Sequence, residues 1–432
     1  MNNALINGQS GVGSGRKSSR YAGVALCWSK LLKIEDRIFT EPKLQVYGFG
    51  VAWVWTIFVG SLLFNGWIIG NDGRSQSLDF CWIWLSGKFA VSSTPVLVYD
   101  PAAFTAAKGA FLGTGECNFL HFGYPPTFLF FSYLFGLLPY ISAFAVWLVA
   151  TIVLYLGAVY AIIPRPAAVT AALTPAAVPL NVLLGHNGFL TAGLIGLSLA
   201  CVERRPWLSG IFLGLLTYKP QFGILFPFVF LASRNWRVLA SATAISVLLG
   251  VSAGIEFGYQ GWQSFIDLLH SRNSTLSPDG MELALQSFYG LFHWAGASVW
   301  LSWTVHLAVT IVVAIAVCVV WTKPISQSLK AAILCIGVVM VTPYLLQYDL
   351  CILSIAVAFL VKDGLARGFL PGERTAMLIC VAGLLLWFAQ IPISPVICVV
   401  LLFLTARRIA AYRCDLLTAS PDEVVGCGPC SA

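Results

Sequence analysis

The sequence predicts an all-α membrane protein: a bundle of about a dozen transmembrane helices with a large first extracytoplasmic loop. The chain of 432 residues is 58% hydrophobic and only 10% charged, whereas soluble domains carry about 25% charged residues. Apolar runs long enough for about 20 helical residues recur from Val46 almost to the C-terminus. Because a backbone in lipid must satisfy its own hydrogen bonds, these runs are expected to be helices.

Thirteen apolar runs follow one another along the chain. The first extends from Val46 to Gly70, and a mixed polar and aromatic loop, 71–122, separates it from the others. The later runs lie near 124–140, 142–163, 167–183, 189–202, 207–218, 220–232, 237–256, 297–321, 329–346, 350–361, 376–390 and 395–406.

Basic residues occupy the segment before the first run and alternate gaps from Arg204 onward. Cytoplasmic loops have this distribution, so the net charge of +7 indicates membrane topology and not a nucleic-acid partner. The residues concerned are Arg16, Lys17, Arg20, Lys30, Lys33, Arg37 and Lys43, then Arg204, Arg205, Arg234, Arg237, Lys323, Lys330, Lys362, Arg367, Arg374, Arg407, Arg408 and Arg413. The same basic residues are candidates for contact with anionic membrane lipids.

Both termini are then cytoplasmic, which requires an even number of crossings, and we expect about twelve. One run therefore does not cross. The run 124–140, bracketed by prolines, is the first candidate, and the region of Pro175 and Pro179 is the second. We divide the chain into a partly disordered cytoplasmic segment (1–45), a transmembrane domain (46–412) and a mobile cytoplasmic tail (413–432).

Five polar stretches fall on the non-cytoplasmic side in this topology: 71–122, 185–188, 218–221, 257–296 and 347–349. Polar residues are costly within a bilayer and are functional candidates by default. Their gathering on one side is the main indication of a functional site.

The first loop places Asp79 beside Trp82 and Trp84. Aromatic faces stack on sugar rings, and a carboxylate can take a hydroxyl proton as a general base. The alternative is an interfacial aromatic belt with a solvated aspartate. Further along, Asp100 before Pro101 has the pattern of a helix N-cap, which predicts a surface helix reaching Lys108.

Three later stretches carry further candidates. Tyr124 either lines a substrate groove or anchors the interface, and His186 with Asn187 forms either a site or a permissive turn. Lys219 opposes the positive-inside trend, so it either binds a lipid phosphate or snorkels to the headgroups. The remaining candidates are Gln221, Arg272 as a second phosphate ligand, and Tyr348 with Asp349, whose carboxylate has Lys219 as a possible partner.

The sequence lacks a GxxxxGK[ST] phosphate loop, an HExxH motif and a DxD-type nucleotide-sugar site. We assign no metal ligand and no cofactor. The two halves of the chain are not obvious repeats of each other, which weakens a transporter interpretation.

In their order and spacing, several motifs resemble the polyprenol-phosphate-sugar-dependent membrane glycosyltransferases of family 87, which include phosphatidylinositol mannoside mannosyltransferases. The resemblance extends from about Val46 to Leu360. The matching pieces are Asp79-Phe80 with Trp84 and Gly87, Tyr99-Asp100-Pro101, Tyr124-Pro125-Pro126-Thr127-Phe128, Leu138-Pro139-Tyr140, Gly185-His186-Asn187-Gly188-Phe189-Leu190, Gly214 to Gln221, and Thr342-Pro343-Tyr344 with Tyr348-Asp349.

The resemblance implies a GT-C-like helical bundle in the cell membrane, with its active site on the extracytoplasmic face. It implies transfer of a hexosyl group, typically mannosyl, from a polyprenyl phosphate sugar to a lipid or glycan acceptor, with inversion. Asp79 would be the base, and Lys219 with Arg272 would stabilise the leaving phosphate. Two residues depart from the family pattern, His186 where Gln is more common and Gln347 where Asp is common.

The main alternative is a transporter or flippase for a glycolipid or polyprenyl-linked sugar, which also needs many helices and an outer polar cavity. A non-catalytic scaffold is the third hypothesis. Loss of glycosyl transfer on replacement of Asp79 would support the enzyme, whereas a scaffold would show no change.

Overall fold

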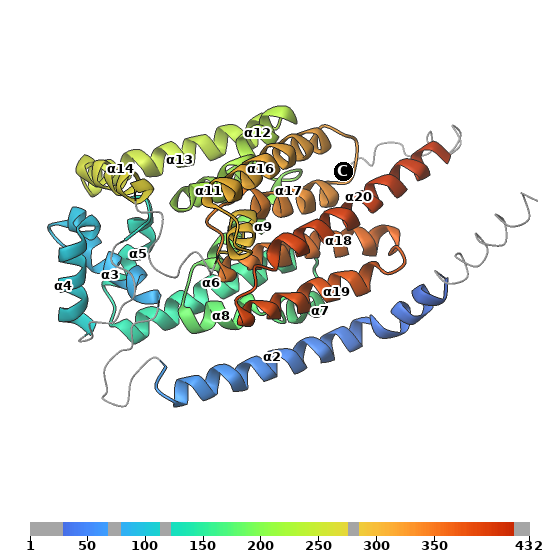
Figure 1. The fold of residues 1–432 in the computed structure, drawn as a ribbon, viewed down its shortest axis with the longest axis horizontal. Helices are drawn as coiled ribbons and strands as arrows, with labels where there is room; N and C mark the ends of the chain where they lie inside the picture. Colours follow the sequence, from blue (N-terminus) through green and yellow to red (C-terminus); the bar gives the residue numbers. More distant parts are fainter. Residues whose placement is uncertain (1–28, 68–78, 113–121, 275–284, 419–432) are drawn as a thin grey trace, which may run out of the picture.

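The computed structural model describes residues 29–67, 79–112, 122–274 and 285–418. Within these ranges the chain forms α-helices and short 3-10 helices and no strand, which confirms the predicted all-α class. Figure 1 shows the long helices running side by side along the longest axis, with shorter helices gathered at one end. The start of the predicted N-terminal segment and most of the predicted tail lie outside the described residues.

In the described ranges, helices follow one another along the chain. The first half of the chain contains α2 (Glu41–Phe64), α3 (Phe80–Ala90), η1 (Pro95–Tyr99), α4 (Pro101–Leu112), α5 (Phe128–Gly136), α6 (Tyr140–Ile162), α7 (Pro166–Ala171), α8 (Ala177–Leu184), α9 (Gly188–Cys201), α10 (Pro206–Gly214) and η2 (Leu215–Tyr218). The second half contains α11 (Pro220–Gly223), α12 (Leu225–Ala232), α13 (Trp236–Glu256), α14 (Tyr259–Ser274), α15 (Phe288–Trp294), α16 (Val299–Trp321), α17 (Gln327–Val341), η4 (Gln347–Leu350), α18 (Cys351–Arg367), α19 (Glu373–Gly383), η5 (Leu384–Ala389) and α20 (Ser394–Thr418).

Among the described residues, five helices are long and apolar enough to cross a bilayer: α2, α6, α13, α16 and most of α20. Shorter apolar helices of 10–17 residues accompany them at 188–201, 206–218, 220–232 and 327–341. The length and apolar composition of these helices therefore indicate a membrane protein, while the twelve crossings stay a prediction. The helix α5, inside the proline-bracketed run, has nine residues, and at 1.5 Å each it spans about 14 Å, too little to cross.

The helix α2 lies at the periphery of the bundle. Only 6% of its apolar window is buried inside the protein, and residues such as Phe49, Trp53 and Ile57 are exposed. Its attachment includes a hydrogen bond from the Trp55 indole Nε1 to the Thr174 carbonyl oxygen at 3.1 Å. This exposure of large apolar side chains fits a helix that faces lipid.

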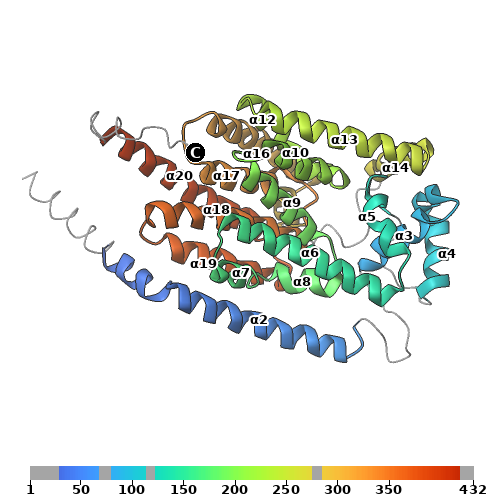
Figure 2. The ribbon, with the colours of Figure 1, turned by 180° about the vertical axis from the view of Figure 1, so that it is seen from behind.

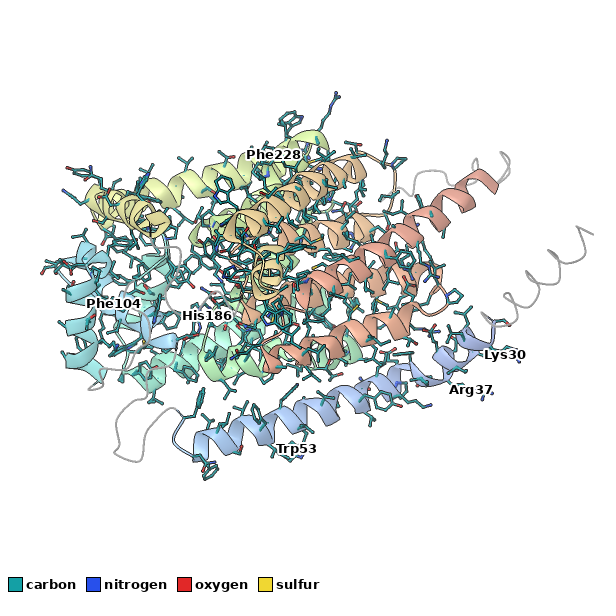
Figure 3. The ribbon with its side chains drawn as sticks, in the orientation of Figure 1. Lys30, Arg37, Trp53, Phe104, His186 and Phe228 are labelled. Atoms are coloured by element: carbon teal, nitrogen blue, oxygen red, sulfur yellow. The ribbon has the colours of Figure 1, made fainter. Side chains whose placement is uncertain are left out.

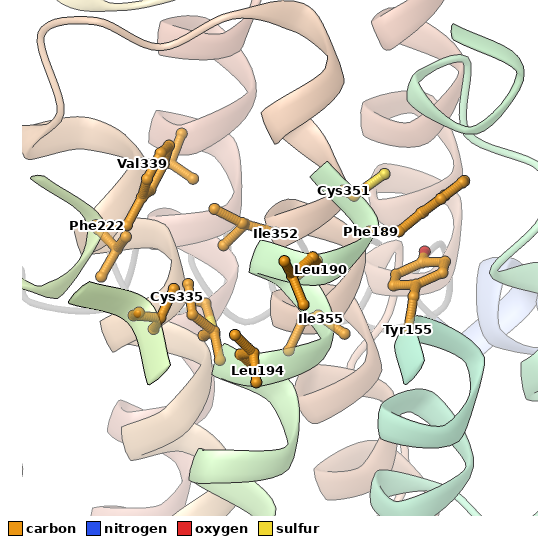
Figure 4. Close-up of a cluster of buried hydrophobic side chains, with 14 of the residues drawn as sticks. Tyr155, Phe189, Leu190, Leu194, Phe222, Cys335, Val339, Cys351, Ile352 and Ile355 are labelled. Atoms are coloured by element: carbon orange, nitrogen blue, oxygen red, sulfur yellow. The ribbon is translucent and has the colours of Figure 1, made fainter. Parts of the chain in front are cut away.

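The core lies where α9 and α18 meet α6 and α17 (Figure 4). Tyr155 of α6 stacks on Phe189 of α9 with ring centroids 5.4 Å apart, and both rings are fully buried. A Cβ at Gly196 would lie 2.9 Å from Ala158 and 3.1 Å from Ile355, so α9 packs closely against both neighbours. Apolar burial of this kind stabilises the packing by about 25 cal/mol per Å².

The two ends of the bundle differ in character. We call the end formed by α3, α4 and α14 the loop end, and the opposite end, where α2 begins and α20 finishes, the terminal end (Figures 1 and 2). Figure 3 places Phe104 at the loop end and Lys30 and Arg37 at the terminal end. The terminal end therefore carries basic residues that the sequence assigns to the cytoplasmic side.

Buried ions fasten the terminal end. Arg408 of α20 contacts Glu373 of α19 and pairs with Asp363 of α18 at 2.8 Å. The Glu35 carboxylate accepts hydrogen bonds from the backbone amides of Gly372 and Thr375, at 3.2 and 2.9 Å, and so caps α19. Each of these charges is almost fully buried, and paired burial is the condition under which charges are tolerated inside proteins.

At the loop end, the predicted N-cap is present: Asp100 Oδ1 accepts from the amides of Ala102 and Ala103 at 2.8 and 2.9 Å. The helices α3 and α5 cross in backbone contact at Gly87 and Gly136. A Cβ at Gly136 would lie 2.2 Å from the Gly87 carbonyl, a distance that no side chain tolerates. This crossing fixes α3, and with it the residue that precedes α3, Asp79.

We predict that Gly136→Ala destabilises the protein by about 1–3 kcal/mol, because the added methyl separates α3 from α5. Thermal unfolding of the purified protein in detergent measures the effect. Gly157→Ala is the matched control, since Gly157 is a helical glycine with open space around its Cβ position. An unchanged melting temperature for Gly136→Ala would contradict the close crossing.

Candidate active site at the loop end

Asp79 immediately precedes α3 and is half-buried. The next residue, Phe80, is fully buried among Tyr140, Phe144 and Trp147, with ring centroids 5.3 to 6.4 Å apart. These aromatic contacts hold the start of α3 against α6. They therefore fix the backbone from which the Asp79 carboxylate projects.

The turn between α8 and α9 lies directly against this segment. Gly185 has a φ of +65°, and a Cβ there would lie 2.7 Å from the Cβ of Phe80. The Trp147 indole Nε1 donates to the Gly185 carbonyl oxygen at 2.9 Å. Only glycine fits this left-handed, crowded position without strain, so the turn brings His186 next to the start of α3.

His186, labelled in Figure 3, and Asn187 belong to one polar cluster. The His186 ring stacks on Tyr348, with centroids 3.5 Å apart and an interplanar angle of 19°. The Asn187 amide Nδ2 donates to the Tyr124 hydroxyl at 2.9 Å. The Asp79 carboxylate lies within electrostatic range of the Tyr348 hydroxyl. The structure thus brings five of the sequence candidates together.

Lys219 and Asp349 form a buried ion pair. The Lys219 Nζ lies 2.7 Å from Asp349 Oδ1, and the side chains are 4% and 2% exposed. This confirms the partner proposed for Asp349. The ammonium also lies 5.0 Å from the centre of the Tyr348 ring, within the range of a cation–π contact. Lys219 therefore contacts the same tyrosine on which His186 stacks.

An aromatic wall continues the cluster. Tyr124 stacks on Phe128 at 4.6 Å between ring centroids, and Tyr218 contacts both Phe128 and Phe131. The Tyr218 hydroxyl lies 2.7 Å from Thr191 Oγ1. Phe128 and Tyr218 are fully buried and support Tyr124, which is half-buried. An aromatic ring with a polar tip, such as Tyr124, suits a surface that meets a sugar or a lipid headgroup.

Tyr99, at the end of η1, positions Tyr124 from outside the bundle. Its hydroxyl donates to the Tyr124 carbonyl oxygen at 2.9 Å. Burial raises the pKa of Tyr99 well above its ordinary value, so the hydroxyl keeps its proton and remains a donor.

Asn181 organises the cluster, and the sequence analysis did not single it out. Its Nδ2 donates to the Tyr348 carbonyl oxygen at 2.8 Å, and its Oδ1 accepts from the Gly188 amide at 2.9 Å. A Cβ at Gly188 would lie 2.1 Å from the same Tyr348 carbonyl. The available signal was an asparagine inside an apolar run, since buried amides need partners.

The other candidates lie elsewhere. The Trp84 indole donates to the Leu138 carbonyl oxygen at 2.9 Å, and its ring packs on Tyr140, so it fastens α3 and is almost fully buried. Trp82 packs edge-on against Phe104 of α4, at 6.3 Å. Gln221 is half-buried on α11. The side chain of Arg272 lies outside the described ones.

In the described part of the chain, no group of three or more His, Cys, Asp or Glu residues is placed to hold a metal ion. The site's charges are instead one half-buried carboxylate and one buried ion pair. Such a site can bind polar groups, exchange a proton and orient an anion.

The fold and this cluster define a polytopic membrane protein with a polar site at one end of the bundle. The sequence profile of glycosyltransferase family 87 matches residues 122–346, just over half of the chain. The protein belongs to glycosyltransferase family 87 and is a membrane glycosyltransferase. Comparisons with curated proteins and with solved structures gave no match.

The matched residues include Tyr124, His186, Asn187 and Lys219. They do not include Asp79, which precedes them, or the Tyr348-Asp349 segment, which follows them. These residues meet the matched part through tertiary contacts: Asp349 pairs with Lys219, Tyr348 stacks on His186, and Phe80, next to Asp79, packs against Gly185.

We predict that Asn181→Ala destabilises the protein by about 1–3 kcal/mol for each buried group it leaves without a partner. The Gly188 amide and the Tyr348 carbonyl would lose their bonds. Thermal unfolding measures the change. Asn65→Ala, which removes an exposed bond to the Ser61 carbonyl, is the control and should have little effect. Equal melting temperatures for the two variants would contradict the assigned role.

Proposed function

We propose that the protein transfers a hexosyl group, with mannosyl as the first candidate, from a polyprenyl phosphate sugar to a lipid or glycan acceptor. The family match carries this proposal. The gathering of Asp79, Tyr348 and Lys219 around one place at the loop end supports it. In this proposal the protein lies in the cell membrane, with the loop end outside and the terminal end in the cytoplasm.

In the proposed reaction, Asp79 accepts the proton of the acceptor hydroxyl. The acceptor oxygen forms a bond to the anomeric carbon of the donor from the face opposite the phosphate. The bond between this carbon and the phosphate oxygen breaks, and its electron pair leaves with polyprenyl phosphate. The anomeric configuration is therefore inverted. A half-buried carboxylate held at the start of α3 is suited to this role as general base.

The leaving phosphate needs positive charge, and Lys219 is the proposed source. Asp349 takes one of the three ammonium hydrogens, and the others can serve a phosphate oxygen. Asp349 would then hold the ammonium in place between Tyr348 and Phe222, whose rings lie 5.0 and 5.3 Å from Nζ. Arg272 remains the second proposed phosphate ligand.

The acceptor and the sugar of the donor would meet the aromatic wall and the polar turn. Tyr124, His186 and Asn187 present hydroxyl, imidazole and amide groups at one place. Because the His186 ring stacks on Tyr348 and its Nδ1 lies 3.0 Å from the Asn187 side-chain oxygen, we propose that it contributes to the choice of substrate.

We predict that Asp79→Asn lowers turnover about 100- to 10,000-fold, the range contributed by a general base. The assay uses the purified protein with polyprenyl phosphate mannose and a panel of glycolipid acceptors, and identifies products by mass. Asp100→Asn is the matched control, because asparagine caps α4 as well as aspartate does.

Full transfer by Asp79→Asn would remove the proposed mechanism. A flippase would be favoured if both the native protein and the variant moved the lipid-linked sugar across vesicle membranes and neither formed a glycosylated product.

We predict that Lys219→Met or Asp349→Leu alone destabilises the protein by about 3–5 kcal/mol, because each leaves a buried charge without its partner. The double variant should recover its melting temperature, since an apolar pair can replace a buried ion pair. Transfer should stay lost in the double variant if Lys219 serves the phosphate. Recovery of both stability and transfer would show that the pair is structural only.

A further inference from the structure

A side crevice lies between α2 and the bundle, apart from the loop-end site. It encloses about 280 Å³. Its walls come from the start of α2, the end of α6, the segment through α7, α18 between Ser354 and Leu365, and α19 between Arg374 and Val381. These helices lie side by side in Figure 2. Most of its lining is apolar, and Leu44, Val159, Ala171, Val361 and Met377 are among the residues.

The apolar lining decides what can fill the crevice. An apolar cavity of about 150 Å³ stays dry and accepts a hydrocarbon instead of water. This crevice is larger, and it borders α2, whose apolar side chains are mostly exposed. In a bilayer, acyl chains surround such a helix. A lipid chain is therefore the natural occupant.

The charged lining residues are Glu41, Arg165 and Arg374. Arg374 is already engaged, since its Nη2 lies 2.6 Å from Asp36 and its side chain is 11% exposed. Arg165 and Glu41 are held less tightly than Arg374. The Arg165 Nη1 lies 3.8 Å from Glu41 Oε2, and each side chain is 47% exposed. This loose pair keeps hydrogen-bonding capacity for a ligand at the edge of the apolar space.

We propose that the crevice binds one zwitterionic aminophospholipid, with an acyl chain in the crevice, its phosphate on Arg165 and its ammonium on Glu41. A purely anionic head would meet Glu41 with a like charge, whereas a head carrying both charges matches both partners. The guanidinium suits a phosphate because it donates two parallel hydrogen bonds. The acyl chain then occupies the space between the start of α2 and the bundle, next to the place where α2 contacts α7.

This lipid is distinct from the sugar donor. The crevice is lined by the start of α2, near the terminal end, whereas Asp79 immediately precedes α3, a helix of the loop end. The proposal does not depend on the proposed reaction, and its test needs no substrate.

The test measures lipid retention by native mass spectrometry of the purified full chain, with phosphatidylethanolamine or phosphatidylglycerol added. The native protein should keep one phosphatidylethanolamine. Arg165→Ala should weaken its retention about fivefold or more. Glu41→Gln should move the preference toward phosphatidylglycerol.

Ala171→Phe fills the crevice and should abolish retention. Ala145→Phe, on the exposed face of α6, is the matched control and should retain the lipid. Unchanged retention by both Ala171→Phe and Arg165→Ala would overturn the site. A preference of the native protein for phosphatidylglycerol would overturn the assignment of the headgroup. Arg165 is exposed, so its variant tests the site even if Ala171→Phe does not fold.

Discussion

Between Lys219 and Asp349, an ammonium and a carboxylate meet at 2.7 Å with almost no access to solvent. Removing either charge from water costs several kcal/mol, and the attraction between them offsets this only when the geometry is good. The two residues are 130 positions apart in sequence. Their pairing therefore joins the break between η2 and α11 to η4. It also brings the ammonium within 5.0 Å of the centre of the Tyr348 ring, on which His186 stacks.

The site is built from interrupted helices. The chain breaks between α8 and α9, between η2 and α11, and between α17 and η4. Each break frees backbone groups that no lipid can satisfy, so other groups must bond to them. Trp147 donates to the Gly185 carbonyl, and Asn181 serves both the Gly188 amide and the Tyr348 carbonyl. The polar surroundings that satisfy these breaks also make the site.

The two ends of the bundle use buried charge differently. At the terminal end, Arg408, Glu373 and Asp363 hold α18, α19 and α20 together. At the site, the buried Lys219–Asp349 pair lies beside the Tyr348 ring, and Asp79 adds a half-buried carboxylate. The first arrangement locks helices, and the second leaves an ionisable group, Asp79, able to exchange a proton. The start of α2, near the terminal end, lies on the outside of the bundle and borders the side crevice.

The sequence by itself determined the class of the protein and many members of the site. Composition and apolar runs fixed a helical membrane bundle because lipid admits few other structures, and polar interruptions such as His186-Asn187 and Lys219 marked the site because polar groups are costly there. The tertiary structure decided which interruptions meet. It paired Lys219 with Asp349, gave Asn181 its role, and assigned Trp84 to packing. These outcomes depend on contacts between residues far apart in the chain, which hydrophobic periodicity does not encode.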